Sequence, residues 1–182
     1  MNIIFLDIDG VLNCTKFRKD RLLSGDYSVA IEPRLLLLLK QLVVITNSSI
    51  VLISSWRKYW IPEGCVDSAG QKIEKALAST GLSILDKTPV LNNGSRSQEV
   101  ERWLKTKGYV DRYVILDDSD FMWSKTLRMH WVQCSSETGL TVQDVEQAIS
   151  IMSGNLIQEE RQILNGVTYI LKKLFNRTNW RE

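Results

Sequence analysis

The segment that most constrains the fold is Phe5-Leu-Asp-Ile-Asp-Gly-Val-Leu-Asn13, near the start of the chain. Here an apolar run leads into two carboxylates, Asp7 and Asp9, and then into Gly10. Successive side chains of a strand point to opposite faces, so a strand that simply continued could not aim both carboxylates at one point. The chain must therefore turn at Asp9 and Gly10, because glycine tolerates backbone angles that other residues avoid.

A buried strand that ends in this way places two acids at the carboxyl edge of a sheet, where open α/β sheets bind their ligands. Carboxylates held this close repel each other unless a cation lies between them. Hard oxygen ligands suit Mg²⁺. The segment therefore predicts a magnesium site that involves Asp7 and Asp9. An ordinary strand followed by an Asp-Gly turn is the alternative for this segment alone.

Two further apolar runs end in polar residues in the same manner. Ile50-Val-Leu-Ile is followed by Ser54, Ser55 and Arg57, and Tyr113-Val-Ile-Leu is followed by Asp117 and Asp118. Between these runs, Arg96 lies at the start of a helical stretch, and the N-terminus of a helix attracts anions. Three strands that each stop at groups able to contact phosphate or metal are hard to explain by packing alone.

Strand and helix signals alternate along the chain. Apolar runs predict strands at residues 2–8, 50–54, 112–117 and about 129–133, with a weaker extended segment from Ile84 to Val90. Helical spacing of apolar residues predicts helices over 33–46, 68–80, 97–107 and 142–153. This alternation predicts a parallel central sheet with right-handed crossovers, that is, a three-layer α/β fold.

Length and composition predict one domain with an appended helix. The 182 residues, 44% of them apolar, are enough to bury a sizeable core. We expect the core to span residues 1–154. Apolar residues recur at helical spacing over 155–182, which we expect to form a helix packed on this core. A dimer through the same helix is the alternative, so both a monomer and a dimer remain open.

Charge and cysteine content argue against several classes of protein. Lysine and arginine number 23 against 21 acidic residues, so nothing in the overall charge attracts nucleic acid, and such a partner must be recognised locally. Three widely spaced cysteines indicate a reducing compartment rather than a disulfide framework. None begins a Cys-x5-Arg loop, which argues against a cysteine-based phosphatase. A single histidine without a Cys-x-x-Cys pair argues against a zinc site.

The sequence predicts a cytoplasmic protein with no membrane partner. A core strand begins at the second residue, which leaves no room for a signal peptide. The most apolar stretch, from Leu35 to Ile45, is interrupted by Lys40 and Gln41 and is too short to span a bilayer.

In order along the chain, Asp-x-Asp, serine, a basic residue and Asp-Asp resemble the four motifs of the haloacid dehalogenase (HAD) superfamily of phosphotransferases, over residues 1 to about 150. A finer resemblance is carried by FLDIDGVLN, ISSWR, KTP at 87–89, R-x-x-E-x-x-x-WL from Arg96 to Leu104, YVILDD, and TGLT at 138–141. These motifs resemble the HAD domain of Swiss-army-knife RNA repair proteins, which is similar to the phosphatase half of polynucleotide kinase-phosphatases.

The resemblance implies a Rossmannoid core and a Mg²⁺-dependent phosphatase that acts on nucleotides or on terminal phosphates of nucleic acid. A phosphatase of small metabolites and a non-catalytic binding module with the same fold are the alternatives. Asp7 matches the nucleophile, which would form an aspartyl-phosphate, and Asp9 matches the general acid and base. The metal would be held by Asp7, by the carbonyl at Asp9 and by an acid of the fourth motif. For that acid Asp118 is the first candidate and Asp117 the second.

The remaining motifs imply the groups that bind phosphate. Ser54 matches the hydroxyl of the second motif, with its neighbour Ser55 as a rival. Arg96 matches the basic residue of the third motif, which is usually lysine; Lys105 and Lys107 are the alternatives, farther from the start of the helix. Arg57 directly follows the second motif, and we expect it either to bind phosphate or to form a surface salt bridge.

The surroundings of the motifs favour a large substrate. The resemblance places a flap at 14–31, which is too short for a cap domain, so the site should be open. This stretch is basic, with Lys16, Arg18, Lys19 and Arg21. The loop after the second motif contains Trp56, Tyr59 and Trp60, which either stack on a nucleobase or fill the core.

Overall fold

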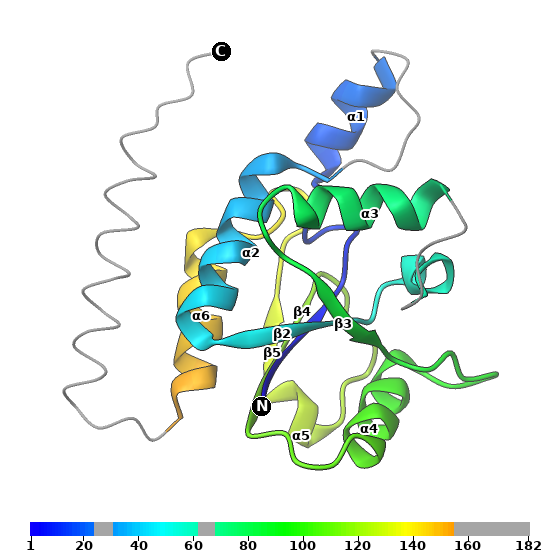
Figure 1. Ribbon diagram of the computed structural model, residues 1–182, viewed down its shortest axis with the longest axis vertical. Helices are drawn as coiled ribbons and strands as arrows, with labels where there is room; N and C mark the ends of the chain where they lie inside the picture. Colours follow the sequence, from blue (N-terminus) through cyan, green and yellow to red (C-terminus); the bar gives the residue numbers. More distant parts are fainter. Residues whose placement is uncertain (24–30, 62–67, 155–182) are drawn as a thin grey trace. The chain divides into compact units, whose positions relative to one another are not determined.

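The computed structural model describes residues 1–23, 31–61 and 68–154 (Figure 1). The chain divides into two compact units, Met1–Met152 and Ser153–Glu182. The helix expected over 155–182 lies outside the described residues, and so does the part of the expected flap at 24–30.

A five-stranded sheet forms the centre of the first unit. Its strands are β1 (Asn2–Leu6), β2 (Ser48–Leu52), β3 (Ile84–Lys87), β4 (Arg112–Asp117) and β5 (Trp131–Gln133). They are all parallel and lie in the order β3-β2-β1-β4-β5. The central strand β1 pairs with β2 and β4, so that Phe5 lies opposite Val51 on one side and Ile115 on the other. Because the strands are parallel, their carboxyl ends meet at one edge of the sheet.

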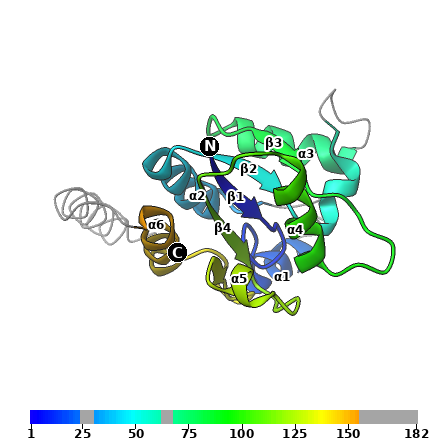
Figure 2. The ribbon, with the colours of Figure 1, turned by 90° about the horizontal axis from the view of Figure 1, so that it is seen from below.

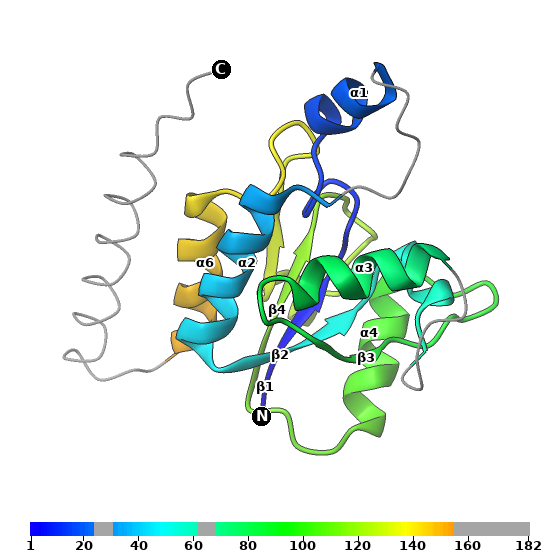
Figure 3. The same cartoon turned by 45° about the horizontal axis from the view of Figure 1, so that its top comes forward.

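Helices cover both faces of this sheet. The longer ones are α2 (Pro33–Thr46), α3 (Ser68–Ala78), α4 (Arg96–Thr106) and α6 (Val142–Ser153). Helices α2 and α6 lie side by side on one face, and α4 lies on the opposite face (Figures 2 and 3). The short helix α5 (Lys125–Arg128) packs on the same face as α4, since Leu127 joins the apolar cluster that contains Val100 and Trp103. The predicted α/β fold with a central parallel sheet and three layers is confirmed.

The sequence of β1 explains its central position. Ile3, Ile4, Phe5 and Leu6 are all fully buried, as expected for a strand of a parallel sheet that is covered on both faces. On the α4 face, the ring of Phe5 meets that of Trp103 edge to face, with 5.3 Å between the ring centroids. The strand that leads into the first two acids is thus buried at four of its five residues.

The described residues contain three short helices that the sequence analysis did not anticipate. These are α1 (Thr15–Leu23), inside the expected flap, the 3₁₀-helix η1 (Ser55–Tyr59), and α5. None has the length or apolar periodicity on which a prediction could rest, and helix α1 buries none of its side chains. The bounds of some strands differ from the prediction by about two residues; the strand expected at 50–54, for example, is Ser48–Leu52.

Within the described ranges, no helix has the length and hydropathy needed to cross a membrane.

Candidate active site

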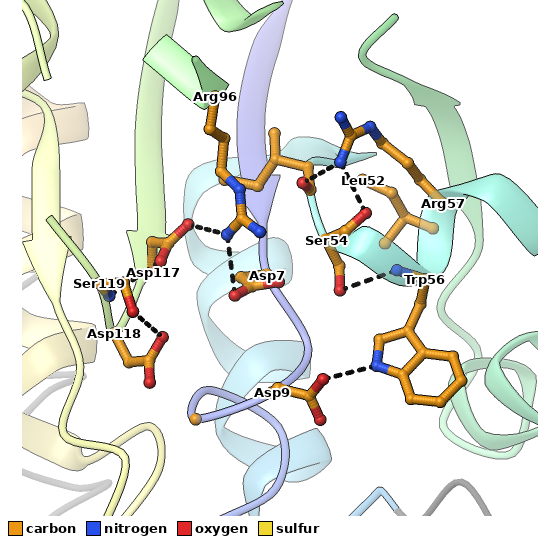
Figure 4. A network of polar contacts seen from close by, with 12 residues as sticks. Asp7, Asp9, Leu52, Ser54, Trp56, Arg57, Arg96, Asp117, Asp118 and Ser119 are labelled. Atoms are coloured by element: carbon orange, nitrogen blue, oxygen red, sulfur yellow. Dashed lines mark hydrogen bonds and ion pairs between the residues drawn. The ribbon is translucent and has the colours of Figure 1, made fainter. Parts of the chain in front are cut away.

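The polar residues of the four motifs meet at the carboxyl edge of the sheet (Figure 4). Asp7 directly follows β1, Ser54 lies two residues beyond β2, and Asp117 is the last residue of β4. Arg96 is the first residue of α4, whose start is fastened by a capping box between Ser95 and Gln98. Three parallel strands and one helix N-terminus therefore point these side chains at a common centre.

The turn after β1 brings the first acids and the fourth motif together. The backbone N–H of Asp7 donates to the carbonyl of Leu116 at 3.0 Å, which extends the pairing of β1 with β4 by one residue. Gly10 then adopts φ +77°, the left-handed conformation that favours glycine. A Cβ atom at this position would lie 2.2 Å from Oδ2 of Asp118. The glycine thus allows both the turn and the close approach of Asp118.

Arg96 links two of the buried acids. Its Nη1 lies 3.0 Å from Oδ2 of Asp7 and also donates to Oδ2 of Asp117. The ring of Phe121 lies against the guanidinium, with 4.0 Å between Cζ and the ring centroid. An arginine suits this position because its planar guanidinium can stack on a ring while it donates in the plane.

Burial makes the negative charges in this cluster costly. It raises the pKa of Asp7, and the opposing effect of Arg96 does not cancel the rise. The pKa of Asp117 is raised to about 7, first by burial and then by the charge of Asp7, again against the influence of Arg96. The cluster therefore favours additional positive charge when both carboxylates are ionised.

The donor set fits a hard divalent cation. Asp7, Asp117 and Asp118 each offer a carboxylate oxygen, and these three oxygens lie within 4.8 Å of one another. Asp117 already uses both of its oxygens, accepting from Arg96 and from the backbone N–H of Ser119 at 2.9 Å. Asp118 accepts from the Ser119 hydroxyl through Oδ1 and keeps Oδ2 beside Gly10. Oxygen ligands without histidine or cysteine suit Mg²⁺ better than Zn²⁺.

The carboxylate of Asp9 lies apart from this cluster and is more exposed. Its Oδ2 accepts from the indole N–H of Trp56 at 2.7 Å, and its Oδ1 accepts from Nδ2 of Asn13 at 3.0 Å. Nη1 of Arg18, on α1, lies 3.8 Å from Oδ1. The side chain of Asp9 keeps 38% of its surface exposed, against 7% for that of Asp7. Asp9 is therefore the acid of the first motif that solvent and a leaving group can reach.

The second motif places its two serines differently. Ser54 is buried, and its hydroxyl accepts from the backbone N–H of Trp56 at 3.3 Å and lies close enough to Asp7 to oppose the rise in the pKa of that carboxyl. The neighbouring Ser55 is exposed. Of the two, only Ser54 is brought to Asp7.

Arg57 is directed into the protein. Its Nη1 donates to the carbonyls of Ile53 at 2.7 Å and Ser54 at 2.9 Å, and its Nη2 donates to Oε2 of Glu99. Both partners of the ion pair with Glu99 are buried. The salt bridge expected at the surface is thus an interior one that joins the second motif to helix α4.

The aromatic residues after the second motif also differ in burial. Trp60 is buried and donates its indole N–H to Glu74 at 2.8 Å, whereas Trp56 and Tyr59 are half-buried neighbours whose ring centroids lie 5.9 Å apart. The sequence analysis missed two contributors, Asn13 and Phe121. Phe121 carries no local signal, because it acts on Arg96 in another motif. Asn13 closes the first segment four residues after Asp9, and that spacing could have indicated its contact with Asp9.

A family model described as the HAD domain in Swiss Army Knife RNA repair proteins matches residues 3–145. The chain belongs to this HAD family. The resemblance carried by the motifs is thereby confirmed, and HAD-type phosphatase chemistry is supported at the level of the family. No curated protein and no solved structure matches the chain.

Proposed function

We propose that this HAD domain is a Mg²⁺-dependent phosphomonoesterase that acts through an aspartyl-phosphate, with terminal phosphates of nucleotides or nucleic acid as substrates. One observation carries the proposal. Asp7, Asp117 and Asp118 converge within 4.8 Å beside the guanidinium of Arg96, while Asp9, two residues after Asp7, keeps its carboxylate accessible. This arrangement offers a nucleophile, a cation site, a phosphate ligand and a separate proton donor, which are the parts that phosphoryl transfer requires.

The two acids of the first motif divide the reaction between them. An oxygen of Asp7 attacks phosphorus as the bond to the ester oxygen breaks, and the protonated Asp9 gives its proton to the leaving alcohol. Asp9, now ionised, takes a proton from a water molecule that attacks the aspartyl-phosphate. Inorganic phosphate leaves, and Asp7 is regenerated. The difference in exposure of the two carboxylates supports this division, because only Asp9 must exchange protons with the leaving group and water.

Arg96 and Ser54 are assigned to the phosphoryl oxygens, since Arg96 pairs with Asp7 and the buried Ser54 hydroxyl lies beside the same carboxylate. Mg²⁺, held by Asp7 and Asp118, with Asp117 as the second candidate, would neutralise charge on the transferring group. Ser55 and Arg57 receive no such role, because Ser55 is exposed away from Asp7 and the hydrogen bonds of Arg57 go to Glu99 and to two backbone carbonyls.

The mechanism is tested by Asp7→Asn, which keeps the shape of the side chain but removes the nucleophile and a metal ligand together. We expect it to abolish the release of p-nitrophenol from p-nitrophenyl phosphate while the protein remains folded by circular dichroism. Asp111→Asn, a change in an exposed acid that pairs with the N-terminus, is the matched control and should remain active. An Asp7→Asn protein as active as wild type would refute the mechanism.

The metal is tested separately. Chelation should remove the activity and Mg²⁺ should restore it. Asp118→Asn should raise the Mg²⁺ concentration that gives half-maximal activity by more than Asp117→Asn does, because Asp117 is occupied by Arg96 and the Ser119 amide. A larger effect at Asp117 would exchange the two assignments, and full activity in chelator would remove the cation from the mechanism.

The choice of substrate rests on helix α1 and on the family. The helix carries Lys16, Arg18, Lys19 and Arg21, and its Arg18 reaches Asp9. A chain that extends from a terminal phosphate would run past these cations. A double variant, Lys16→Ala with Lys19→Ala, should therefore raise KM for a phosphorylated oligonucleotide. The KM of this variant should also depend less steeply on salt concentration, because fewer counterions are released on binding.

Arg18 is left intact in this test, since its contact with Asp9 would confuse binding with catalysis. The same variant should leave p-nitrophenyl phosphate unaffected. Removal of two exposed lysines elsewhere, Lys40→Ala with Lys125→Ala, controls for the loss of overall charge. Equal behaviour of the two double variants on the oligonucleotide would favour a small phosphorylated metabolite as the substrate.

A further inference from the structure

The carboxylate of Asp9 is held by a hydrogen-bond donor to which none of the four motifs gives a role. The indole N–H of Trp56 donates to Oδ2 at 2.7 Å, the shorter of the two hydrogen bonds that fix the two oxygens of this side chain (Figure 4). Trp56 lies in the 3₁₀-helix that follows the second motif, 47 positions along the chain from Asp9. The contact therefore joins the loop of the second motif to the turn of the first.

We propose that Trp56 is a positioning residue for proton transfer: its indole N–H holds the Asp9 carboxylate in the orientation from which Asp9 exchanges a proton with the leaving group. The proposal rests on the proposed function, in which Asp9 is the general acid and base. It assigns Trp56 no contact with the transferred phosphoryl group.

The position of Asp9 makes such a constraint necessary. Its side chain keeps 38% of its surface exposed, so packing alone does not fix its rotamer. General acid and base catalysis requires the carboxylate to stay within hydrogen-bond reach of the leaving oxygen, and a freely rotating side chain would spend much of its time elsewhere. With Trp56 on Oδ2 and Asn13 on Oδ1, the plane of the carboxylate is set from two sides.

The chemistry of indole suits this task. An indole N–H only donates, so it cannot take the proton that Asp9 must pass to the leaving group, whereas a hydroxyl or imidazole in the same place could accept it. Trp56 carries no charge, so the anionic phosphate of a substrate does not draw it away from Asp9. The guanidinium of Arg18 is the charged neighbour of Asp9, at the longer distance of 3.8 Å.

Trp56 is itself held in place by the second motif. The Ser54 hydroxyl accepts from the backbone N–H of Trp56 at 3.3 Å. The next residue, Arg57, is buried and fastened to the carbonyls of Ile53 and Ser54. The turn that carries Trp56 is therefore fixed at Ser54 and at Arg57.

The protein contains a matched control for this contact. Trp60, four residues along the same loop, donates its indole N–H to the carboxylate of Glu74 at 2.8 Å. Trp56→Phe and Trp60→Phe therefore each remove one indole–carboxylate hydrogen bond and keep an aromatic ring. The two variants differ in which carboxylate is released, and only Asp9 belongs to the site.

The kinetic test compares two leaving groups in single-turnover experiments, where release of the leaving group reports the first step alone. Trp56→Phe should slow the release of glycerol from glycerol phosphate by about 10- to 100-fold, the equivalent of one hydrogen bond to a charged group. The release of p-nitrophenol, which needs no protonation, should change little, and substrate affinity should stay the same. Trp60→Phe should show no such dependence on the leaving group. An equal loss on both substrates, or none on either, would overturn the proposal.

A second test does not require turnover. In ¹⁵N-labelled protein, the indole N–H resonance that disappears in Trp56→Phe should shift in Asp9→Asn and stay in place in Glu74→Gln, and the Trp60 resonance should behave in the opposite way. If the indole N–H resonance of Trp56 does not shift in Asp9→Asn, the proposal is overturned even if the enzyme is active. A wild-type protein that is inactive on every phosphomonoester, yet shows the expected shifts, would refute the proposed function and leave the Trp56–Asp9 contact established.

Discussion

Glu99→Gln provides the most demanding test of how the site is supported. The carboxylate of Glu99 accepts from Arg57 through Oε2 and from the backbone N–H of Leu91 through Oε1, at 3.0 Å for the latter. Glutamine has the same shape but offers one carbonyl oxygen and one amide group. Whichever way the amide is turned, a donor must face either Arg57 or Leu91. The substitution therefore removes the counter-charge of a buried guanidinium and also breaks one hydrogen bond.

The structure allows an estimate of the cost. Both partners are almost completely buried, with 7% of each side chain exposed, so solvent cannot replace the lost carboxylate. Breaking a buried ion pair from one side typically costs about 3–5 kcal/mol, because the remaining charge is left uncompensated. Arg57 retains its bonds to the carbonyls of Ile53 and Ser54, which favours the lower end of that range. We therefore expect the free energy of unfolding to fall by about 3 kcal/mol, a large share of the stability of a single domain.

Urea unfolding at constant pH measures this change as a shift of the midpoint with an unchanged slope. Glu101→Gln, a change in a less buried acid of the same helix, is the matched control and should be nearly neutral. The double variant Arg57→Met with Glu99→Leu should recover most of the loss, since apolar residues can replace a buried pair. A cost below about 1 kcal/mol for Glu99→Gln, the range of exposed pairs, would refute the reasoning. So would a double variant no more stable than the single one.

Three further outcomes are expected. Asp9→Asn should lower turnover by about 10²–10⁴-fold in a steady-state assay with an alkyl phosphate, while Mg²⁺-dependent binding of substrate is retained. Phe121→Leu should lower turnover by about 2- to 30-fold through the loss of the ring stacked on Arg96, and Arg96→Lys should cost more because lysine also loses the planar guanidinium. In chelator, the free energy of unfolding should fall as the pH rises from 3.8 to about 7, and urea titrations of Asp117→Asn should show a shallower fall. The reason is that the pKa of Asp117 is raised to about 7 in the folded state. Between pH 3.8 and about 7 the folded protein therefore keeps a proton on Asp117 that the unfolded chain has released.

The sequence alone was sufficient for the architecture and for the location of the site. Short apolar runs such as Ile3–Leu6 are typical of strands covered on both faces, and their alternation with amphipathic helices favours a parallel sheet. In such a sheet the carboxyl ends of all strands lie at one edge. Polar residues that follow separate strands, such as Asp7, Ser54 and Asp117, must therefore come together even though they are distant in the chain.

Other features were settled only by the tertiary structure. Which of Ser54 and Ser55 lies beside Asp7 depends on where β2 ends, and strand bounds carry an uncertainty of about two residues in a sequence-based prediction. For Arg57 the sequence left open phosphate binding and a surface salt bridge, and the structure shows a buried ion pair instead, because burial depends on what packs against a residue. Its partner Glu99 lies 42 positions away on a helix that docks beside the same loop.

The contact between Trp56 and Asp9 shows the same limit most clearly. The sequence indicated that Trp56 lies near the phosphate site and left open whether it stacks on a base or fills the core. In the folded chain its ring is half-buried, and its N–H binds the carboxylate of Asp9. Hydrophobic periodicity determines which face of an element is buried, whereas a hydrogen bond between two turns depends on the packing of the elements that carry them. The sequence therefore determined that acids of separate motifs meet at this edge of the sheet, and the tertiary structure decided which carboxylates converge and what holds each of them in place.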